Sequence, residues 1–262
     1  MILFDSHCHI NDPVFDPDFD QMMARAADEG VRAMMIAGVD PDTVSRALEL
    51  AHAHANIVTA VGLHPHDAAQ CTPELLDQFT QLARTESSIK AWGEIGLDFN
   101  RMFSPQEDQE AAFIDQMNRA GELDLPLIFH ERDSNGRFYE ILKSEAPEAR
   151  KGVIHCFSGT KEEMFKYLDL GYHIGITGIL TIQQRGAHLR ELAPHIPEDR
   201  ILIETDAPYL TPKPQKNKHR RNEPAFVKSV LLRLAEIREC DAEELAQIVF
   251  DNTQRLYGTD FS

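Results

Sequence analysis

Hydrophobic and polar positions alternate along the chain with two different periods. Short runs rich in β-branched residues are each followed by a segment in which apolar positions recur with helical spacing. The first kind of segment predicts a β-strand and the second predicts an amphipathic helix. Eight strands are predicted in this way: Ile2–Ile10, Arg32–Val39, Ile57–His64, Lys90–Asp98, Leu127–Arg132, Gly152–Phe157, Tyr172–Ile179 and Arg200–Asp206.

Between these strands, capping residues and a proline mark where several helices are predicted to begin. The segments Ser104–Glu107 and Thr160–Glu163 have the form of capping boxes. Thr72-Pro73 places proline at the first position of a helix, where its missing N–H costs nothing. After the last strand, Glu223–Glu239 and Asp241–Tyr257 predict the final two helices.

The alternation of strands and helices predicts the architecture. Repeated strand–helix units imply parallel pairing through right-handed crossovers. Eight such units in 262 residues favour a closed TIM (β/α)8 barrel of the α/β class over an open sheet. No repeat, low-complexity tract or linker divides the sequence, so we expect one domain over residues 1–262. The segment Thr211–Arg221, rich in proline and lysine, is expected to form a long loop after the eighth strand.

Composition indicates an ordinary globular protein, with 42% hydrophobic and 26% charged residues. The sequence has no basic leader before an apolar stretch and no apolar run long enough to span a bilayer. We therefore expect a cytoplasmic protein without a membrane partner. We also expect it to be a monomer. The four cysteines form no CxxC pair, which is typical of a reducing compartment rather than a disulfide framework.

The net charge of −17 argues against broad electrostatic binding of nucleic acid, because most of the surface would repel phosphate. A nucleic-acid substrate would have to enter a locally positive or metal-filled cleft. One short segment, Lys213–Arg221, carries five lysine and arginine residues and no acidic residue. It is equally compatible with a solvated loop and with a phosphate-binding patch.

Histidines and carboxylates stand where predicted strands end. His7 and His9 in the first strand point to the same face, because strand side chains alternate. Glu94, His130, His155 and Asp206 lie at the ends of the fourth, fifth, sixth and eighth strands. In a barrel the carboxyl ends of the strands meet at one mouth, where active sites of this fold lie.

These six side chains are too many for one tetrahedral ion. We therefore predict two divalent ions per chain, with Glu94 as the carboxylate that bridges them. The mixture of imidazole and carboxylate suits zinc, manganese or iron, and it suits magnesium less well because magnesium prefers oxygen. The identity of the metal is left open among Mg²⁺, Mn²⁺ and Zn²⁺.

Six motifs make the sequence similar to the TatD family of metal-dependent hydrolases, and they span essentially the whole chain. The motifs are Phe4-Asp5-Ser6-His7-Cys8-His9, Val61-Gly62-Leu63-His64-Pro65, Gly93-Glu94-Ile95-Gly96-Leu97-Asp98, His155-Cys156-Phe157-Ser158-Gly159, Glu204-Thr205-Asp206-Ala207-Pro208-Tyr209-Leu210 and Arg221-Asn222-Glu223-Pro224. The resemblance implies an amidohydrolase-like barrel, two divalent metals and deoxyribonuclease activity, often as a 3′–5′ exonuclease.

The family's ligand motifs fall on particular residues of this chain. The resemblance implies that His7, His9, Glu94 and Asp206 hold one metal. The other metal would be held by a second set that shares the bridging residue, namely Glu94, His130 and His155. Glu94 stands where other amidohydrolases carry a modified lysine, which separates this chain from the hydantoinase-like branch.

The hypothesis for the reaction is that water activated by two metals gives a proton to Asp206 and attacks the phosphorus of a DNA phosphodiester. Asp206 and Glu94 are thus the predicted catalytic residues. His64, Arg132 and Arg221 are candidates for holding the substrate phosphate. Glu204 is a further candidate for the substrate cavity, as an ion-binding or orienting group or as a buried carboxylate paired with a base.

Three functions are weighed. The first is cleavage of DNA, single-stranded or at 3′ ends, with the choice between endonuclease and exonuclease left open. The second is hydrolysis of a carboxylic ester, lactone, amide or aminoacyl ester at the same metal site. The third is a non-catalytic metal-binding or nucleic-acid-binding protein, against which the complete ligand set and a candidate base argue.

Overall fold

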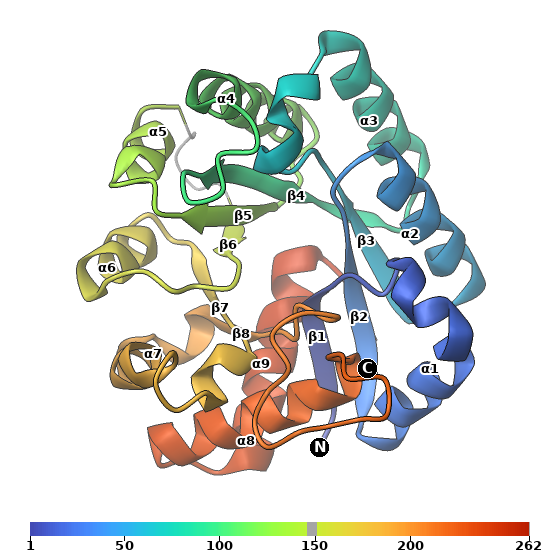
Figure 1. Cartoon of the computed structure of the whole chain (residues 1–262), viewed down its shortest axis with the longest axis vertical. Helices are drawn as coiled ribbons and strands as arrows, with labels where there is room; N and C mark the ends of the chain where they lie inside the picture. The colour runs from blue at the N-terminus through green and yellow to red at the C-terminus, as the bar shows by residue number, and fades with distance from the viewer. Residues whose placement is uncertain (146–150, 262) are drawn as a thin grey trace. The chain divides into compact units, whose positions relative to one another are not determined.

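The structure is a computed structural model that describes residues 1–145 and 151–261 (Figure 1). It contains eight parallel β-strands in the described chain. The strands are β1 (Leu3–Cys8), β2 (Val31–Gly38), β3 (Ile57–Val61), β4 (Ile89–Asp98), β5 (Leu127–Arg132), β6 (Gly152–Ile154), β7 (His173–Ile176) and β8 (Ile201–Ile203). By contacts the chain divides into two compact units, unit 1 with Met1–Ile36 and Ile174–Ser262 and unit 2 with Ala37–His173.

Helices alternate with the strands along the chain, as the colours in Figure 1 show from blue to red. The α-helices are α1 (Phe19–Asp28), α2 (Pro41–Ala53), α3 (Pro73–Thr85), α4 (Gln106–Glu122), α5 (Arg137–Glu145), α6 (Lys161–Asp169), α7 (Ala187–Leu192), α8 (Val227–Arg238) and α9 (Ala242–Tyr257). Short 3₁₀ helices are η1 (Pro13–Asp18), η2 (Pro65–Gln70), η3 (Gly178–Thr181), η4 (Ala193–His195), η5 (Glu198–Arg200) and η6 (Pro224–Phe226). None of the helices in the described ranges is long and apolar enough to cross a membrane.

In unit 1, β1 pairs in parallel with β2 and β7 pairs in parallel with β8. Strand β1 also contacts β8, and helices α8 and α9 pack against each other. The apolar core of this unit includes Phe4 of β1, whose ring lies 6.2 Å from the rings of both Phe250 and Tyr257. The Tyr257 hydroxyl donates to the backbone oxygen of Ser6 at 3.1 Å, which ties α9 to β1.

In unit 2, β3, β4, β5 and β6 pair in parallel in chain order. The aromatic core stacks Phe113 of α4 on Phe138 of α5 at 5.0 Å, with Phe129 of β5 edge-on to both. The indole of Trp92 donates to Gln116 at 3.2 Å, so its buried N–H is satisfied. This packing fixes α4 and α5 against the neighbouring strands β4 and β5.

Parallel strands that pair in chain order, each followed by a helical segment, are the connectivity of a TIM (β/α)8 barrel. The predicted fold class is therefore confirmed, and each of the eight predicted strands corresponds to a strand. The main error is at carboxyl ends, because β8 stops at Ile203 whereas the prediction continued to Asp206. Glu204, Thr205 and Asp206, which carry polar side chains, follow the last residue of the strand. The expectation of one domain over residues 1–262 stays a prediction.

Helix starts were predicted with mixed success. The capping box of Thr160 and Glu163 and the position of Pro73 at the start of α3 are confirmed. The capping box at Ser104 is wrong, because α4 begins at Gln106 without a side-chain cap. Ser104 instead donates to the backbone oxygen of His66 at 2.8 Å and accepts from the backbone N–H of Ala69 at 3.0 Å. Its hydroxyl thus holds η2, the 3₁₀ helix before α3.

The two predicted C-terminal helices are confirmed as α8 and α9. Both end at a residue in the left-handed conformation, Glu239 and Gly258. The segment Thr211–Arg221 contains neither helix nor strand, as expected for a long loop after β8.

Candidate metal centre

Unit 1 brings three of the predicted metal ligands together. The Nε2 atoms of His7 and His9 lie 3.2 Å apart, and Oδ1 of Asp206 lies 3.4 Å from His9 Nε2 and 3.9 Å from His7 Nε2. Ligand atoms around a tetrahedral zinc lie about 3.3–3.5 Å apart, because their bonds to zinc measure about 2.0–2.2 Å. Cys8, between the histidines, is fully buried and its thiol faces the backbone oxygen of Met35, as alternation predicts.

Backbone hydrogen bonds hold these side chains in place. The N–H of His9 donates to the carbonyl oxygen of Ala207 at 2.7 Å, and the N–H of Asp206 donates to the carbonyl oxygen of His7 at 3.0 Å. The segment after β8 is thereby fixed alongside the end of β1. Asp206 itself adopts a left-handed conformation with φ of 57°. The strand has ended there, and the turn directs the carboxylate toward the histidines.

Two buried carboxylates support this end of β8. Asp5 accepts hydrogen bonds from the backbone N–H and the hydroxyl of Thr205, at 2.8 and 2.5 Å. Burial raises the pKa of Asp5 to about 8, although the bonds from Thr205 act in the opposite direction. Glu204 is also fully buried, and a Cβ on Gly175 would lie only 2.7 Å from its carboxylate. Glycine at that position leaves room for the Glu204 side chain.

Unit 2 collects three histidines around Glu94, which is only 3% exposed. Its Oε2 atom lies 3.2 Å from His130 Nδ1, 3.6 Å from His64 Nε2 and 4.0 Å from His155 Nε2. Glu94, His130 and His155 are the predicted ligands of the second metal, and the structure brings them together. The donors again have the spacing and chemistry of a site for zinc or a similar divalent ion.

His130 is contacted from its other side by Asp98, a residue for which the sequence predicted no role. Oδ2 of Asp98 lies 3.4 Å from His130 Nε2 and 2.7 Å from His66 Nε2. Burial alone would raise the pKa of Asp98. Interactions with His130, His66 and backbone N–H groups outweigh burial and hold this pKa well below its usual value. Burial acts to lower the pKa of His130, but the interactions of His130 with Asp98 and Glu94 outweigh burial, so this pKa is raised.

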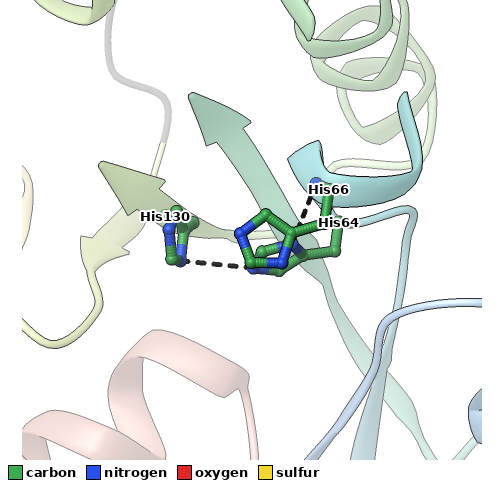
Figure 2. Close-up of side chains that lie close together, drawn as sticks. All are labelled: His64, His66 and His130. Carbon is green, nitrogen blue, oxygen red and sulfur yellow. Dashed lines mark hydrogen bonds between the residues drawn. The ribbon is translucent and has the colours of Figure 1, made fainter. Parts of the chain in front are cut away.

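Three histidines of unit 2 have nitrogens close enough to form a metal-binding group: His64, His66 and His130. Figure 2 shows the bond between His64 and His130, at 3.3 Å, and the bond from the backbone N–H of His66 to Nδ1 of His64, at 3.1 Å. His66 was missed at the sequence level. Its position two residues after His64, in η2 beyond the end of β3, was the available signal.

The end of β4 lies unusually close to β5, which carries His130. A Cβ on Gly96, whose φ is 143°, would lie 1.9 Å from the backbone oxygen of His130, so only glycine permits this approach. The side-chain amide of Gln109 brackets the backbone of Asp98, accepting from its N–H at 2.8 Å and donating to its carbonyl at 3.3 Å. The polar side chains at the strand end are thus held by α4.

The predicted phosphate contacts differ in their surroundings. Arg132, half-buried at the end of β5, makes no ion pair with any residue in the described ranges. Arg221 is buried, and its guanidinium donates to Asp18 at 2.6 Å and stacks 4.3 Å from the ring centre of Phe15. Asp18 also binds Arg25 at 2.8 Å. Arg221 therefore already has an anionic partner within unit 1.

Comparison with known proteins decides the family. A family model described as TatD related DNase matches residues 4–258. The chain belongs to the TatD family. Among its TatD relatives, "3'-5' ssDNA/RNA exonuclease TatD" of Citrobacter koseri is 40% identical over 99% of this chain and 100% of the relative. The "Uncharacterized metal-dependent hydrolase YabD" of Bacillus subtilis is 38% identical over 98% of this chain and 99% of the relative.

Solved structures agree with the TatD assignment. YJJV, a TatD homologue from Escherichia coli K12, superposes with a TM-score of 0.89 at 30% identity, covering 98% of both chains. A TatD family hydrolase from Entamoeba histolytica gives the same TM-score at 27% identity, also with 98% of both chains. An uncharacterized amidohydrolase from Saccharomyces cerevisiae shares the fold, with a TM-score of 0.86 at 20% identity, covering 98% of this chain and all of that one.

Proposed function

We propose that this TatD chain is a metal-dependent hydrolase of DNA phosphodiester bonds that removes nucleotides from the 3′ end of single strands. The observation that carries the proposal is the spacing of the donors. His7, His9 and Asp206 lie 3.2–3.9 Å apart in unit 1, and three histidines surround Glu94 in unit 2. Relatives that are about 40% identical carry the name of a 3′–5′ exonuclease on single-stranded DNA and RNA.

We further propose that the two groups of donors serve two divalent ions. His7, His9, Glu94 and Asp206 would hold one ion, and Glu94, His130 and His155 the other. The proposal is supported by position, because all six residues lie at or just beyond the carboxyl ends of strands, and in a TIM barrel active-site residues come from these ends. Mg²⁺, Mn²⁺ and Zn²⁺ are the candidates, and the imidazoles favour the last two.

The ions would supply hydroxide at neutral pH and neutralise charge on the phosphate. The residues of the chain have separate tasks. Asp206 accepts the proton that the attacking water loses. Arg132, a cation without an acidic partner in the described ranges, binds a phosphate oxygen, and His64 donates a further hydrogen bond to it. Arg221 and Glu204 were candidates for the substrate cavity, but both are buried, and supporting roles suit them better.

Electrostatics limits the contact to a short stretch of DNA. A net charge of −17 repels a long phosphate backbone, so binding is expected to depend on the metals and a few donors. The lysines of Lys213–Arg221 would add a local attraction at most, since Arg221 is neutralised by Asp18. We accordingly expect a shallow dependence of the affinity on salt. We also propose that the protein acts as a monomer in the cytoplasm, which light scattering and cell fractionation would test.

The test is an assay on end-labelled DNA with Mg²⁺, Mn²⁺ or Zn²⁺ added to metal-free protein. A 5′-labelled single strand should shorten one nucleotide at a time, whereas a duplex with protected ends should not. Glu94→Ala should abolish the activity, and Glu86→Gln, an exchange at an ion pair with His52, should retain it. Metal-dependent hydrolysis of carboxylic esters, lactones or amides without any cleavage of DNA would overturn the proposal in favour of the other hydrolase class.

A further inference from the structure

The segment between β4 and α4 in unit 2 presents two large apolar side chains to solvent, close to the histidines around Glu94. Met102 is 46% exposed and Phe103 is 67% exposed. We infer that Phe103 is a substrate-binding residue, on whose ring a nucleobase beside the cleaved phosphate stacks. The inference rests on the proposed function and deepens it, because it says which part of a nucleotide is recognised besides the phosphate.

The first step is the position of the ring. The centre of the Phe103 ring lies 4.8 Å from that of His66, in an edge-on arrangement. The His66 ring in turn lies 4.1 Å from the ring of His64 and 6.0 Å from that of His130, and Figure 2 shows these three histidines together. His64 and His130 both face Glu94. One imidazole therefore separates Phe103 from the predicted site, and only a sugar separates a base from its phosphate.

The second step is that the ring is held in place although it is exposed. Ser104, the next residue, is 1% exposed, and its hydroxyl joins the backbone oxygen of His66 to the backbone N–H of Ala69. The side-chain amide of Gln109 donates to the backbone oxygen of Ser104 at 2.9 Å. The backbone beside Phe103 is thus fixed before any substrate binds. A preformed surface of this kind loses little conformational entropy on binding.

The third step is the charge around the ring. Arg101 is exposed two residues before Phe103, and Arg132 is half-buried at the end of β5, the strand that pairs with β4. Neither arginine makes an ion pair within the part of the chain that the structure describes. The carboxylate of Asp133 accepts from the side-chain amide of Asn100 at 2.8 Å instead. Two such cations near an apolar ring suit an occupant that is both anionic and flat, as a DNA strand is.

The fourth step is that stacking supplies affinity which the charge of this chain does not. A net charge of −17 opposes a long row of phosphate contacts, whereas a base stacks on an aromatic ring without any net charge. Stacking also tolerates every base, as an exonuclease requires. Inside a duplex both faces of a base are covered by its neighbours. Phe103 is therefore expected to favour an unpaired base, and with it a single strand.

The first experiment compares the original chain with Phe103→Ala, both loaded with the same metal. Affinity is measured on a short single strand whose phosphorothioate linkages resist hydrolysis, and kinetics on the ordinary strand. Phe103→Ala should weaken binding about 5–150-fold and raise KM by a similar factor, with kcat nearly unchanged, while Phe103→Tyr should bind normally. The control is Phe165→Ala, because Phe165 is 41% exposed on α6 of the same unit and its ring faces Lys161. It should have no effect.

A strand that lacks one base tests the contact itself. Two further strands lack the base on one or the other nucleotide that flanks the last phosphate. The original chain should bind one of them about 5–150-fold more weakly than the complete strand. Phe103→Ala should bind that strand and the complete strand equally, because the partner of the base is already gone. A merely structural role would weaken the binding of both strands alike.

A fluorescent reporter gives a readout that needs no cleavage. Trp92 is the only tryptophan of the chain and is fully buried, so Phe103→Trp adds one exposed indole at the proposed contact. The complete strand should quench its emission, and the strand without the stacked base should not. Phe165→Trp is the matched control, and neither strand should quench it.

Equal affinity of the original chain and Phe103→Ala for the complete strand would overturn the inference. Independent losses from the missing ring and the missing base would do the same. So would a dimer that Phe103→Ala dissociates with unchanged affinity for DNA, since the ring would then serve a contact between copies. A chain that passes these tests but cleaves no DNA would overturn the proposed function alone. A chain that binds no strand would overturn both.

Discussion

The two units each support a group of predicted ligands with a fully buried aspartate, yet the two aspartates differ in charge. In unit 1, burial raises the pKa of Asp5 to about 8, and the nearby Glu204 adds to this rise, although the hydrogen bonds from Thr205 and from the backbone of His7 act in the opposite direction. In unit 2, burial acts in the same direction on Asp98, but two histidines and two backbone N–H groups outweigh it and keep the carboxyl charged. The comparison teaches that the donors, rather than depth, decide the charge of a buried carboxyl.

The difference has a consequence for function. Asp98 touches a predicted ligand directly, through Nε2 of His130, so it acts on the chemistry of that ligand. Asp5 touches Thr205, the residue before Asp206, so it acts on the course of the backbone. Changes in unit 2 should therefore appear first in metal binding, and changes around Asp5 should appear first in stability.

The largest effect is expected for Glu94, the proposed bridge. Glu94→Ala should release both ions and reduce DNA cleavage below detection, because each ion loses a charged ligand. Elemental analysis after dialysis would measure the metal content. His155→Ala is the matched comparison, and it should lose only one of the ions. Retention of both ions by Glu94→Ala would show that Glu94 is not the bridging ligand.

The next effect tests the proton acceptor of unit 1. Asp206→Asn should lower kcat by about 10²–10⁴-fold, the contribution typical of a positioned general base. Steady-state kinetics on a short single strand would measure it. Asp199→Asn, at an exposed ion pair with Arg200 just before β8, should be neutral. An Asp206→Asn enzyme with full metal content and full activity would contradict the role of base.

A smaller effect is expected for the buried cation of unit 1. Arg221→Met should lower the free energy of unfolding by about 2–3 kcal/mol, less than the loss of a whole buried pair, because Asp18 keeps Arg25. Urea unfolding would measure this change. The exposed neighbour Arg220 serves as the control, and Arg220→Ala should leave stability unchanged. If Arg221→Met instead raised KM with stability intact, a direct contact with the substrate would be the better account.

The smallest effect concerns the pH dependence of Asp5. Its pKa is raised from 3.8 to about 8, so its contribution to stability is present below about pH 4 and is lost as the pH rises through 8. Asp5→Asn cannot ionise, so its melting temperature should exceed that of the original chain by about 3 °C or more at pH 9 and differ less at pH 5. Thermal unfolding of metal-free protein measures both. The exposed Asp28→Asn should show no such change, and an equal difference at both pH values would contradict the assignment.

Much of the fold could be predicted because strands and helices leave local signals. The eight strands were located from hydrophobic runs, and the helix starts at Pro73 and Thr160 were found from a few neighbouring residues each. The error at Ser104 has the opposite cause. Its hydroxyl is used by His66 and Ala69, which lie more than thirty residues away, and no local pattern reports such a partner.

The sequence by itself determined which side chains stand at the ends of strands, because strand periodicity and the family motifs are both written along the chain. It therefore gave His7, His9 and Asp206, and it gave Glu94, His130 and His155. Only the tertiary structure decided what lies behind them. That Asp98 holds His130 and that Asp18 occupies Arg221 depend on contacts between residues 32 and 203 positions apart. Hydrogen bonds over such separations arise from packing, which no short stretch of sequence encodes.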